Sequence, residues 1–495
     1  MKSHSQTPSS ALPREVFILA MQGFVRRTGA RFYDSAVIWA LVFTAVRTGG
    51  NLLVLPLLLH KLSPDEMGLW YVFLSLSGIS AMIDLGFSAT MTRVTAFLWA
   101  GAQDIPAMGV PSVESESTGP NYRLLAELVQ TMRLYYRAAG VVVTLLLATA
   151  GTMWIIHRIQ TLSHSRWLLM AWLLFLPGVL INTTSGMWHP LLSGINRVRL
   201  NQQILVYGLV VNYIAIFTGL LLGAGLLAPV TGYLLMGLIA RNAARVPFRK
   251  LTNASRYDGI SGSVKMLRTL WPTAWRTGIV TLGLYATINL NTLICFLFLG
   301  LKATASFGVS LQLALAATGV ANTFVAVKIP LISQMRARLQ TQAISGLVFS
   351  RLRFFWIAFL GFSSLAISCG HLVFRDILHS NTPLLSTPML VVLFVVIGLE
   401  AHHAIFREIT LTSHFNPFAT PVIVSAIMIV ILSLALVQWI GLWGLILAPG
   451  LVQICFNNWW TVAVGLRSMD SSLGNYARGL FGRLPVAHSI IPSLH

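Results

Sequence analysis

Residues 47–93 have the sequence RTGGNLLVLPLLLHKLSPDEMGLWYVFLSLSGISAMIDLGFSATMTR, in which two apolar runs flank a short polar turn. A helix needs about 20 apolar residues to cross the hydrocarbon core of a bilayer. The turn carries signals for the start of a helix, because Ser63 can cap it, Pro64 suits its first turn and Glu66 completes a capping box. The segment therefore predicts two membrane-spanning helices that are joined outside the bilayer.

The composition of the whole chain extends this interpretation to all 495 residues. Hydrophobic residues make up 56% and charged residues only 10%, with a mean hydropathy of +0.75. A soluble domain has about a quarter charged residues, so this chain must be solvated by lipid. The net charge of +20 is spread over short loops, where lipid head groups and membrane topology explain it. We therefore expect an all-α polytopic membrane protein and no nucleic-acid partner.

The apolar runs predict about twelve transmembrane helices and almost no soluble domain. Their expected ranges are 34–59, 68–98, 134–157, 166–192, 201–226, 229–247, 270–299, 303–332, 350–374, 384–406, 417–437 and 441–466.

The distribution of lysine and arginine orients these spans. With the N-terminus in the cytoplasm, the cytoplasmic side holds 27 of the 34 basic residues, and Arg47 and Arg276 lie within spans. The opposite side holds only Lys61, Arg158, Arg166, Lys302 and Arg375. Because basic residues favour the cytoplasmic side, both termini are expected there.

A polar segment near the middle divides the chain into two halves of six spans each. The expected parts are a cytoplasmic tail (1–33), a first six-helix bundle (34–248), a basic linker (249–268), a second six-helix bundle (269–467) and a C-terminal tail (468–495). An offset of 240 aligns Asn51 with Asn291 and Gly68 with Gly308. An even number of spans per half makes this a parallel repeat, as in transporters built from two like bundles.

Arg47 and Arg276 fall in the first span of each half. Ionisable groups inside a bilayer are costly, so each of them requires an explanation. Two guanidinium groups in a central cleft could hold a phosphate or diphosphate through forked hydrogen bonds. Alternatively, Arg47 pairs with Asp84 and pins the first two helices together, and Arg276 extends to the cytoplasmic interface.

Two acidic residues lie within spans, Asp84 and Glu400. Glu400 is a candidate proton or cation site, or it pairs with its own His403 or with a neighbouring helix. His402 and His403 are adjacent and face different sides of a helix, so no metal site is expected, and no cofactor or catalytic motif is present.

Three amide side chains within the spans could contact sugar hydroxyls: Asn51, Asn291 and Gln312. Hydrogen bonds between helices are the alternative role for such groups.

Two regions resemble a known family. Residues 47–93 resemble the opening hairpin of bacterial polysaccharide and O-antigen flippases. The segments LWPTAWRTGIVTLGLYATINLNTLICFLFLG (270–300) and KIPLISQMRARL (328–339) resemble the start of their second half. These flippases belong to the multidrug/oligosaccharidyl-lipid/polysaccharide (MOP) exporter superfamily.

The resemblance implies two six-helix bundles around a central cavity in the bacterial inner membrane. It implies alternating-access export of a polyprenyl-diphosphate-linked oligosaccharide for surface polysaccharide synthesis, with polysaccharide polymerase as a candidate partner. Arg47 and Arg276 match the positions of cationic cavity residues. The coupling ion, a proton or sodium, is left open by the resemblance, as are the roles of Asp84 and Glu400.

Two other functions compete with this one. An organic-cation exporter of the same superfamily would need an acidic cleft, which Asp84 and Glu400 allow and Arg47 disfavours. A polytopic glycan polymerase or ligase would need a large external loop, but the external loops here have about ten residues or fewer. We therefore expect a transporter and not an enzyme.

Overall fold

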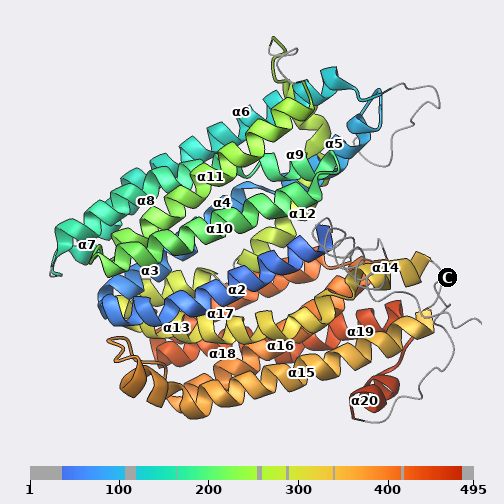
Figure 1. The fold of residues 1–495 in the computed structure, drawn as a ribbon. Helices are drawn as coiled ribbons and strands as arrows, with labels where there is room; N and C mark the ends of the chain where they lie inside the picture. The colour runs from blue at the N-terminus through green and yellow to red at the C-terminus, as the bar shows by residue number, and fades with distance from the viewer. Residues whose placement is uncertain are drawn as a thin grey trace, which may run out of the picture.

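The computed structural model describes residues 36–105, 119–162, 164–253, 259–285, 289–337, 341–413 and 417–481 (Figure 1). These residues form helices joined by short turns, with no strand in the described ranges. Eight helical segments there are long and apolar enough to cross a membrane, judged by length and composition. The all-α polytopic prediction is confirmed.

The described residues of the first half form ten α-helices and one π-helical turn. They are α2 (Ala36–Lys61), α3 (Pro64–Ser77), α4 (Ile79–Ile83), α5 (Phe87–Trp99), α6 (Tyr122–Leu146), a π-helical turn (Leu147–Gly151), α7 (Thr152–Ile159), α8 (Ser165–Ser185), α9 (Trp188–Gly194), α10 (Val198–Leu221) and α11 (Leu227–Leu251).

The described residues of the second half form nine α-helices and two complete π-helical turns. They are α12 (Val264–Tyr285), α13 (Asn291–Ala326), α14 (Ile329–Ala337), α15 (Thr341–Leu372), a π-helical turn (Val373–Ile377), α16 (Thr387–Leu411), α17 (Ala419–Ile440), α18 (Leu442–Val452), a second π-helical turn (Gln453–Asn457), α19 (Asn458–Ser468) and α20 (Leu473–Phe481).

Helical segments occupy each of the twelve expected ranges, but several are interrupted. The backbone of α13 leaves helical geometry at Gly300 (φ 81°), between the runs expected at 270–299 and 303–332. Glycine tolerates this conformation because it lacks a Cβ atom. The run expected at 68–98 as one helix is divided into α3, α4 and α5, with positive φ at Leu85 (43°) and Gly86 (75°). The single-helix expectation for that run is therefore wrong.

The turn between α2 and α3 has the predicted capping box. The backbone N–H of Glu66 donates to Ser63 Oγ at 3.3 Å, and the N–H of Ser63 donates to Glu66 Oε2 at 2.9 Å. Two N–H groups that would lack partners at the helix start are thereby satisfied.

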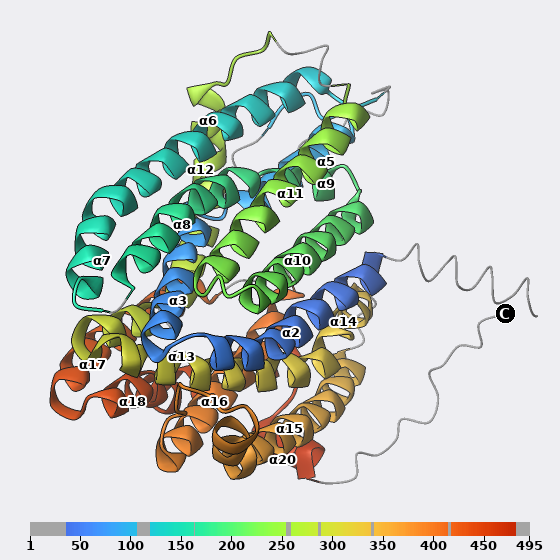
Figure 2. The ribbon, with the colours of Figure 1, turned by 60° about the vertical axis from the view of Figure 1, so that its left-hand side comes forward.

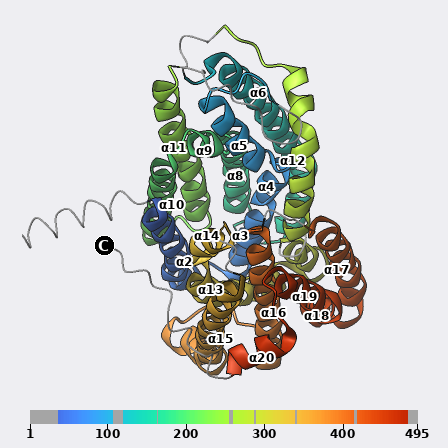
Figure 3. The ribbon, with the colours of Figure 1, turned by 90° about the vertical axis from the view of Figure 1, so that its right-hand side faces the viewer.

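The helices form two groups that diverge toward the end carrying α14 (Figure 1). One group contains α6 and α8–α11, and the other contains α15, α16 and α18–α20, as the turned view also shows (Figure 2). Between them lie α2, α3, α12 and α13. Figure 3 shows α2 beside α10 at one side and α12 beside α17 at the other, and both pairs are in contact.

The two groups meet along α3 and α13, which pack closely together. Small residues allow this approach: a Cβ atom added at Gly68 would lie 2.2 Å from the carbonyl oxygen of Leu301, and one at Gly308 would lie 2.4 Å from the ring of Tyr71. Small residues at helix crossings are typical of membrane proteins, where close van der Waals packing drives association. The two glycines aligned by the offset of 240 therefore lie at one helix crossing.

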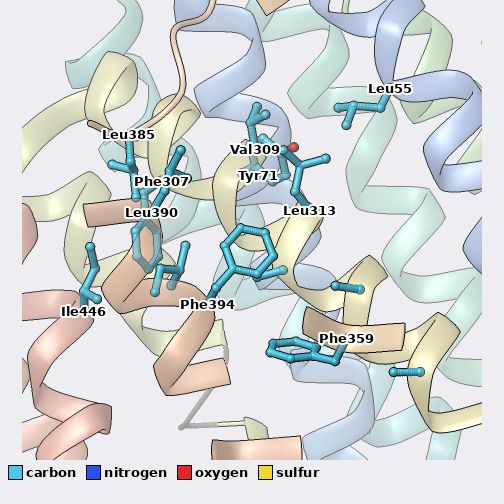
Figure 4. Packing of buried hydrophobic residues seen from close by; sticks show 14 of the residues in the cluster. Leu55, Tyr71, Phe307, Val309, Leu313, Phe359, Leu385, Leu390, Phe394 and Ile446 are labelled. Atoms are coloured by element: carbon cyan, nitrogen blue, oxygen red, sulfur yellow. The ribbon is translucent and has the colours of Figure 1, made fainter. Parts of the chain in front are cut away.

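Aliphatic and aromatic side chains fill the core next to this crossing. Phe307, Val309 and Leu313 of α13 pack beside Tyr71 of α3, with Leu390 and Phe394 of α16 behind them (Figure 4). The core therefore fixes α13 against the second group of helices while the opposite face of α13 meets α3.

Candidate functional site

A cavity of about 530 Å³ lies between helices of the two halves. Residues of α2, α3, α10, α11 and α13 line it. This volume is typical of a small-molecule or head-group site. The lining combines apolar walls with hydroxyl and amide groups contributed by Thr48, Asn51, Ser75, Asn212 and Gln312, among others.

Arg47 is the single charged residue among the described residues that line the cavity. Its side chain is exposed, and its guanidinium carbon lies 5.9 Å from the centre of the Phe43 ring, one turn earlier on α2. No carboxylate of the described part of the chain lies within salt-bridge distance of it. A cation without a protein counter-ion leaves its donors available to an anionic ligand.

Two tyrosines connect the cavity-lining helices. Tyr71 donates to Gln312 Oε1 at 2.5 Å, which joins α3 to α13. Tyr213 donates to Asn51 Oδ1 at 3.1 Å and to the carbonyl oxygen of Arg47 at 2.9 Å, which joins α10 to α2. These bonds hold the backbone that carries Arg47 and fix the orientation of two amide groups at the cavity wall.

Asp84 lies at the break between α4 and α5, away from the cavity lining. Its carboxylate accepts from the N–H and hydroxyl of Ser88, at 3.2 Å and 2.6 Å, and from the hydroxyl of Tyr136. The backbone of Ile83 accepts from Tyr135 at 2.8 Å. Asp84 therefore holds the broken helix against α6, and it forms no salt bridge with Arg47.

The helix α12 packs closely against the backbone at the break between α4 and α5. A Cβ atom added at Gly278 would lie 2.5 Å from the carbonyl carbon of Leu85. Arg276 lies on the same helix, but its side chain is outside the described residues, so its expected place in the cleft remains a prediction.

Glu400 lies on α16, in the second group of helices and outside the cavity lining. Its carboxylate accepts from Gln453 Nε2, and its Oε1 lies 3.7 Å from His403 Nε2. A small hollow of about 20 Å³ adjoins Glu400, His403, Arg407 and Asn457. The alternative contact between Glu400 and His403, one turn apart on α16, is therefore present in the structure.

The three amides predicted for glycan contact are in different environments. Asn51 and Gln312 line the cavity. Asn291 is buried, donates to the carbonyl oxygen of Leu445 at 3.2 Å and accepts from Ser433 at 2.8 Å. The side chain of Asn291 thus bonds neighbouring helices, the role expected for amides that do not meet the substrate.

Tyr71 and Tyr213 are functional candidates that sequence reasoning missed. Tyr71 lies near the start of one apolar run, and Tyr213 lies inside another. The available signal was the polar atom of each phenol within an apolar span, where a buried hydroxyl needs a partner.

No protein-family model and no curated protein sequence matches this chain. Solved structures do match along nearly the whole length. A multidrug resistance MATE family transporter of the MOP superfamily, in an inward-facing conformation, aligns with a TM-score of 0.63 over 89% of this chain and 100% of the other, at 12% identity. The fold is that of MOP superfamily transporters. Two of the solved structures that share this fold are described as transporters.

Two further MOP structures with this fold differ from the first in conformation or in the described pocket. An outward-facing MATE family transporter aligns with a TM-score of 0.55 over 88% of this chain and 95% of its own, at 12% identity. A MOP superfamily transporter from Pyrococcus furiosus, described as having a binding pocket of reversed polarity that suggests a different function, aligns with a TM-score of 0.56 over the same shares, at 12% identity. At this identity the MOP similarity establishes the fold and leaves the substrate open.

Proposed function

We propose that this protein is a flippase that moves a polyprenyl-diphosphate-linked oligosaccharide from the cytoplasmic to the periplasmic leaflet of the bacterial inner membrane, for surface polysaccharide synthesis. The observation that carries the proposal is Arg47, a cavity cation that has no carboxylate partner among the described residues. A diphosphate supplies the oxygens that a guanidinium group binds through paired hydrogen bonds. Asn51 and Gln312, whose amides also line the cavity, are the candidate contacts for the adjoining sugar.

Alternating access supplies the transport mechanism. The helix groups diverge toward the end carrying α14, and the TM-score is higher with the inward-facing relative than with the outward-facing one. In this state the head group would enter from the cytoplasmic side, with its lipid tail remaining in the bilayer. Separation of α3 from α13 would then open the cavity on the other side.

Two acidic residues, Glu400 and Asp84, are candidates for binding the ion that drives transport. Glu400, with His403 beside it, is the stronger candidate for a proton or sodium site because a hollow adjoins it. Asp84 is occupied by Ser88 and Tyr136, so a structural role suits it better.

Export of organic cations is the second candidate, because MATE family multidrug transporters share the fold. A cationic drug requires a negative site, yet neither Asp84 nor Glu400 belongs to the described cavity lining. The Pyrococcus furiosus relative, with its reversed pocket polarity, gives a precedent for a different function on this fold.

A deletion strain distinguishes these two functions. We expect it to accumulate lipid-linked glycan on the cytoplasmic leaflet, to lose surface polysaccharide and to extrude a cationic dye as fast as the parent strain. Complementation with the intact gene should restore the surface polysaccharide. Normal glycan export together with slowed dye extrusion would instead assign the protein to the drug exporters.

A further inference from the structure

Five arginines that play no part in the central cavity recur at helical spacing on two helices. Arg241, Arg245 and Arg249 lie four residues apart on α11, and Arg133 and Arg137 lie four residues apart on α6. Residues four apart lie on one face of a helix. Each helix therefore presents one stripe of positive charge.

The two stripes meet across a shallow groove. One hollow is bordered by Arg133, Arg137, Arg241 and Arg245, and an adjoining one by Arg133 and Arg249. Both hollows also border Trp188 of α9. They are small, about 10 Å³ for the first and 30 Å³ for the second, so a ligand would lie across them and would not enter.

The groove concentrates positive charge. Arg133 is within coulombic range of the other four arginines. The guanidinium carbon of Arg245 lies 5.9 Å from the centre of the Trp188 ring, which holds it over the hollow. Within the described ranges, no carboxylate forms a salt bridge with Arg133, Arg137, Arg241 or Arg245. Like charges four residues apart repel, so an anion bound between the stripes would stabilise this arrangement.

The position of the groove identifies the source of that anion. The helices α6 and α11 lie at the side of the molecule farthest from α15 and α20 (Figures 1 and 3), away from the central cavity. Arg249 lies two residues and Arg241 ten residues before the C-terminal end of α11. The stripe of arginines therefore extends about 15 Å along the helix from that end. Beside the arginines, Leu134 and Val246 are 65% and 50% exposed and provide an apolar surface for acyl chains.

We propose that the groove between α6 and α11 binds the phosphate-bearing head group of an anionic phospholipid of the cytoplasmic leaflet. The guanidinium groups bind the phosphodiester oxygens, and the apolar residues next to them contact the acyl chains. The lipid would tie α6 to α11 within the first group of helices. This assignment holds whichever molecule the cavity transports.

Native mass spectrometry of the purified full-length protein with added phosphatidylglycerol tests the site. We expect saturable binding, and about tenfold weaker binding for the double variant Arg133→Gln with Arg245→Gln. A second double variant, Arg137→Gln with Arg241→Gln, should show the same loss and guards against a folding defect of the first. As a matched control, Arg268→Gln with Arg467→Gln removes two exposed arginines from outside the groove and should bind as the wild type does.

Three results would overturn the proposal. Both groove variants could bind phosphatidylglycerol as tightly as the control variant. Phosphatidylcholine could bind as tightly as phosphatidylglycerol, which would exclude recognition of charge. Inorganic pyrophosphate could displace the lipid and bind equally well alone, which would make the groove a site for free anions and not for a lipid.

Discussion

Arg47→Ala should abolish glycan export while the protein continues to accumulate in the membrane. The variant removes the one charged group of the described cavity lining, together with the paired hydrogen bonds that we propose it makes to the diphosphate. Such charge-assisted bonds contribute about 3 kcal/mol together, so transport should fall about a hundredfold. Surface polysaccharide in a complemented deletion strain measures the effect, and immunoblotting of membranes measures accumulation.

Arg47→Lys is the matched control because it keeps the charge but loses the planar fork of donors. We expect partial export, since lysine binds phosphate as a point charge. Because Arg47 forms no salt bridge with a described residue, neither variant leaves an unpaired carboxylate among the described residues. Normal surface glycan in Arg47→Ala would remove Arg47 from the substrate site.

Gly68→Leu should block transport by forcing α3 away from α13. Its Cβ atom would lie 2.2 Å from the backbone carbonyl of Leu301, which cannot rotate aside as a side chain can. Overpacking of this kind costs about 2 kcal/mol, which changes the ratio of two conformations about thirtyfold. Cysteine cross-linking between α3 and α13 measures the loss of the closed state, and surface glycan measures the loss of export.

Gly361→Leu provides the control, because Gly361 is exposed and a Cβ atom there meets nothing within 4 Å. This variant should export glycan normally. If Gly68→Leu cross-links and exports as well as Gly361→Leu does, the tight α3–α13 crossing is unnecessary for transport.

The sequence was most informative where hydropathy and local geometry decide the structure. Apolar runs located the helical segments, and Ser63 with Glu66 formed the capping box that their spacing predicts. The break at Asp84–Gly86 was missed because the run around it is apolar enough to be taken as one span, and hydropathy does not register backbone conformation. The hydroxyl groups that donate hydrogen bonds to Ile83 and Asp84 at this break belong to Tyr135 and Tyr136, each 52 residues away from its acceptor in the chain.

The candidate site was only partly accessible from the sequence. Arg47 was singled out because it is a charged residue inside a predicted span, and in the structure it lines the cavity. The amides looked equivalent in sequence, yet Asn291 bonds Ser433 and Leu445 while Gln312 reaches the cavity, because helix rotation decides which way a side chain points. The division into domains at 249–268 remains a prediction, and so does the role of Arg276.

In the proposed mechanism a diphosphate head group occupies the cavity beside Arg47. Photo-crosslinking tests it most directly, with p-benzoylphenylalanine placed at Ala316, which lines the cavity, or at Leu53, which is 79% exposed on α2 and outside the lining. We predict that lipid-linked oligosaccharide is labelled from position 316, is not labelled from position 53, and loses its label when Arg47→Ala is added. Equal labelling from both positions, or labelling from position 316 that Arg47→Ala leaves unchanged, would contradict the account.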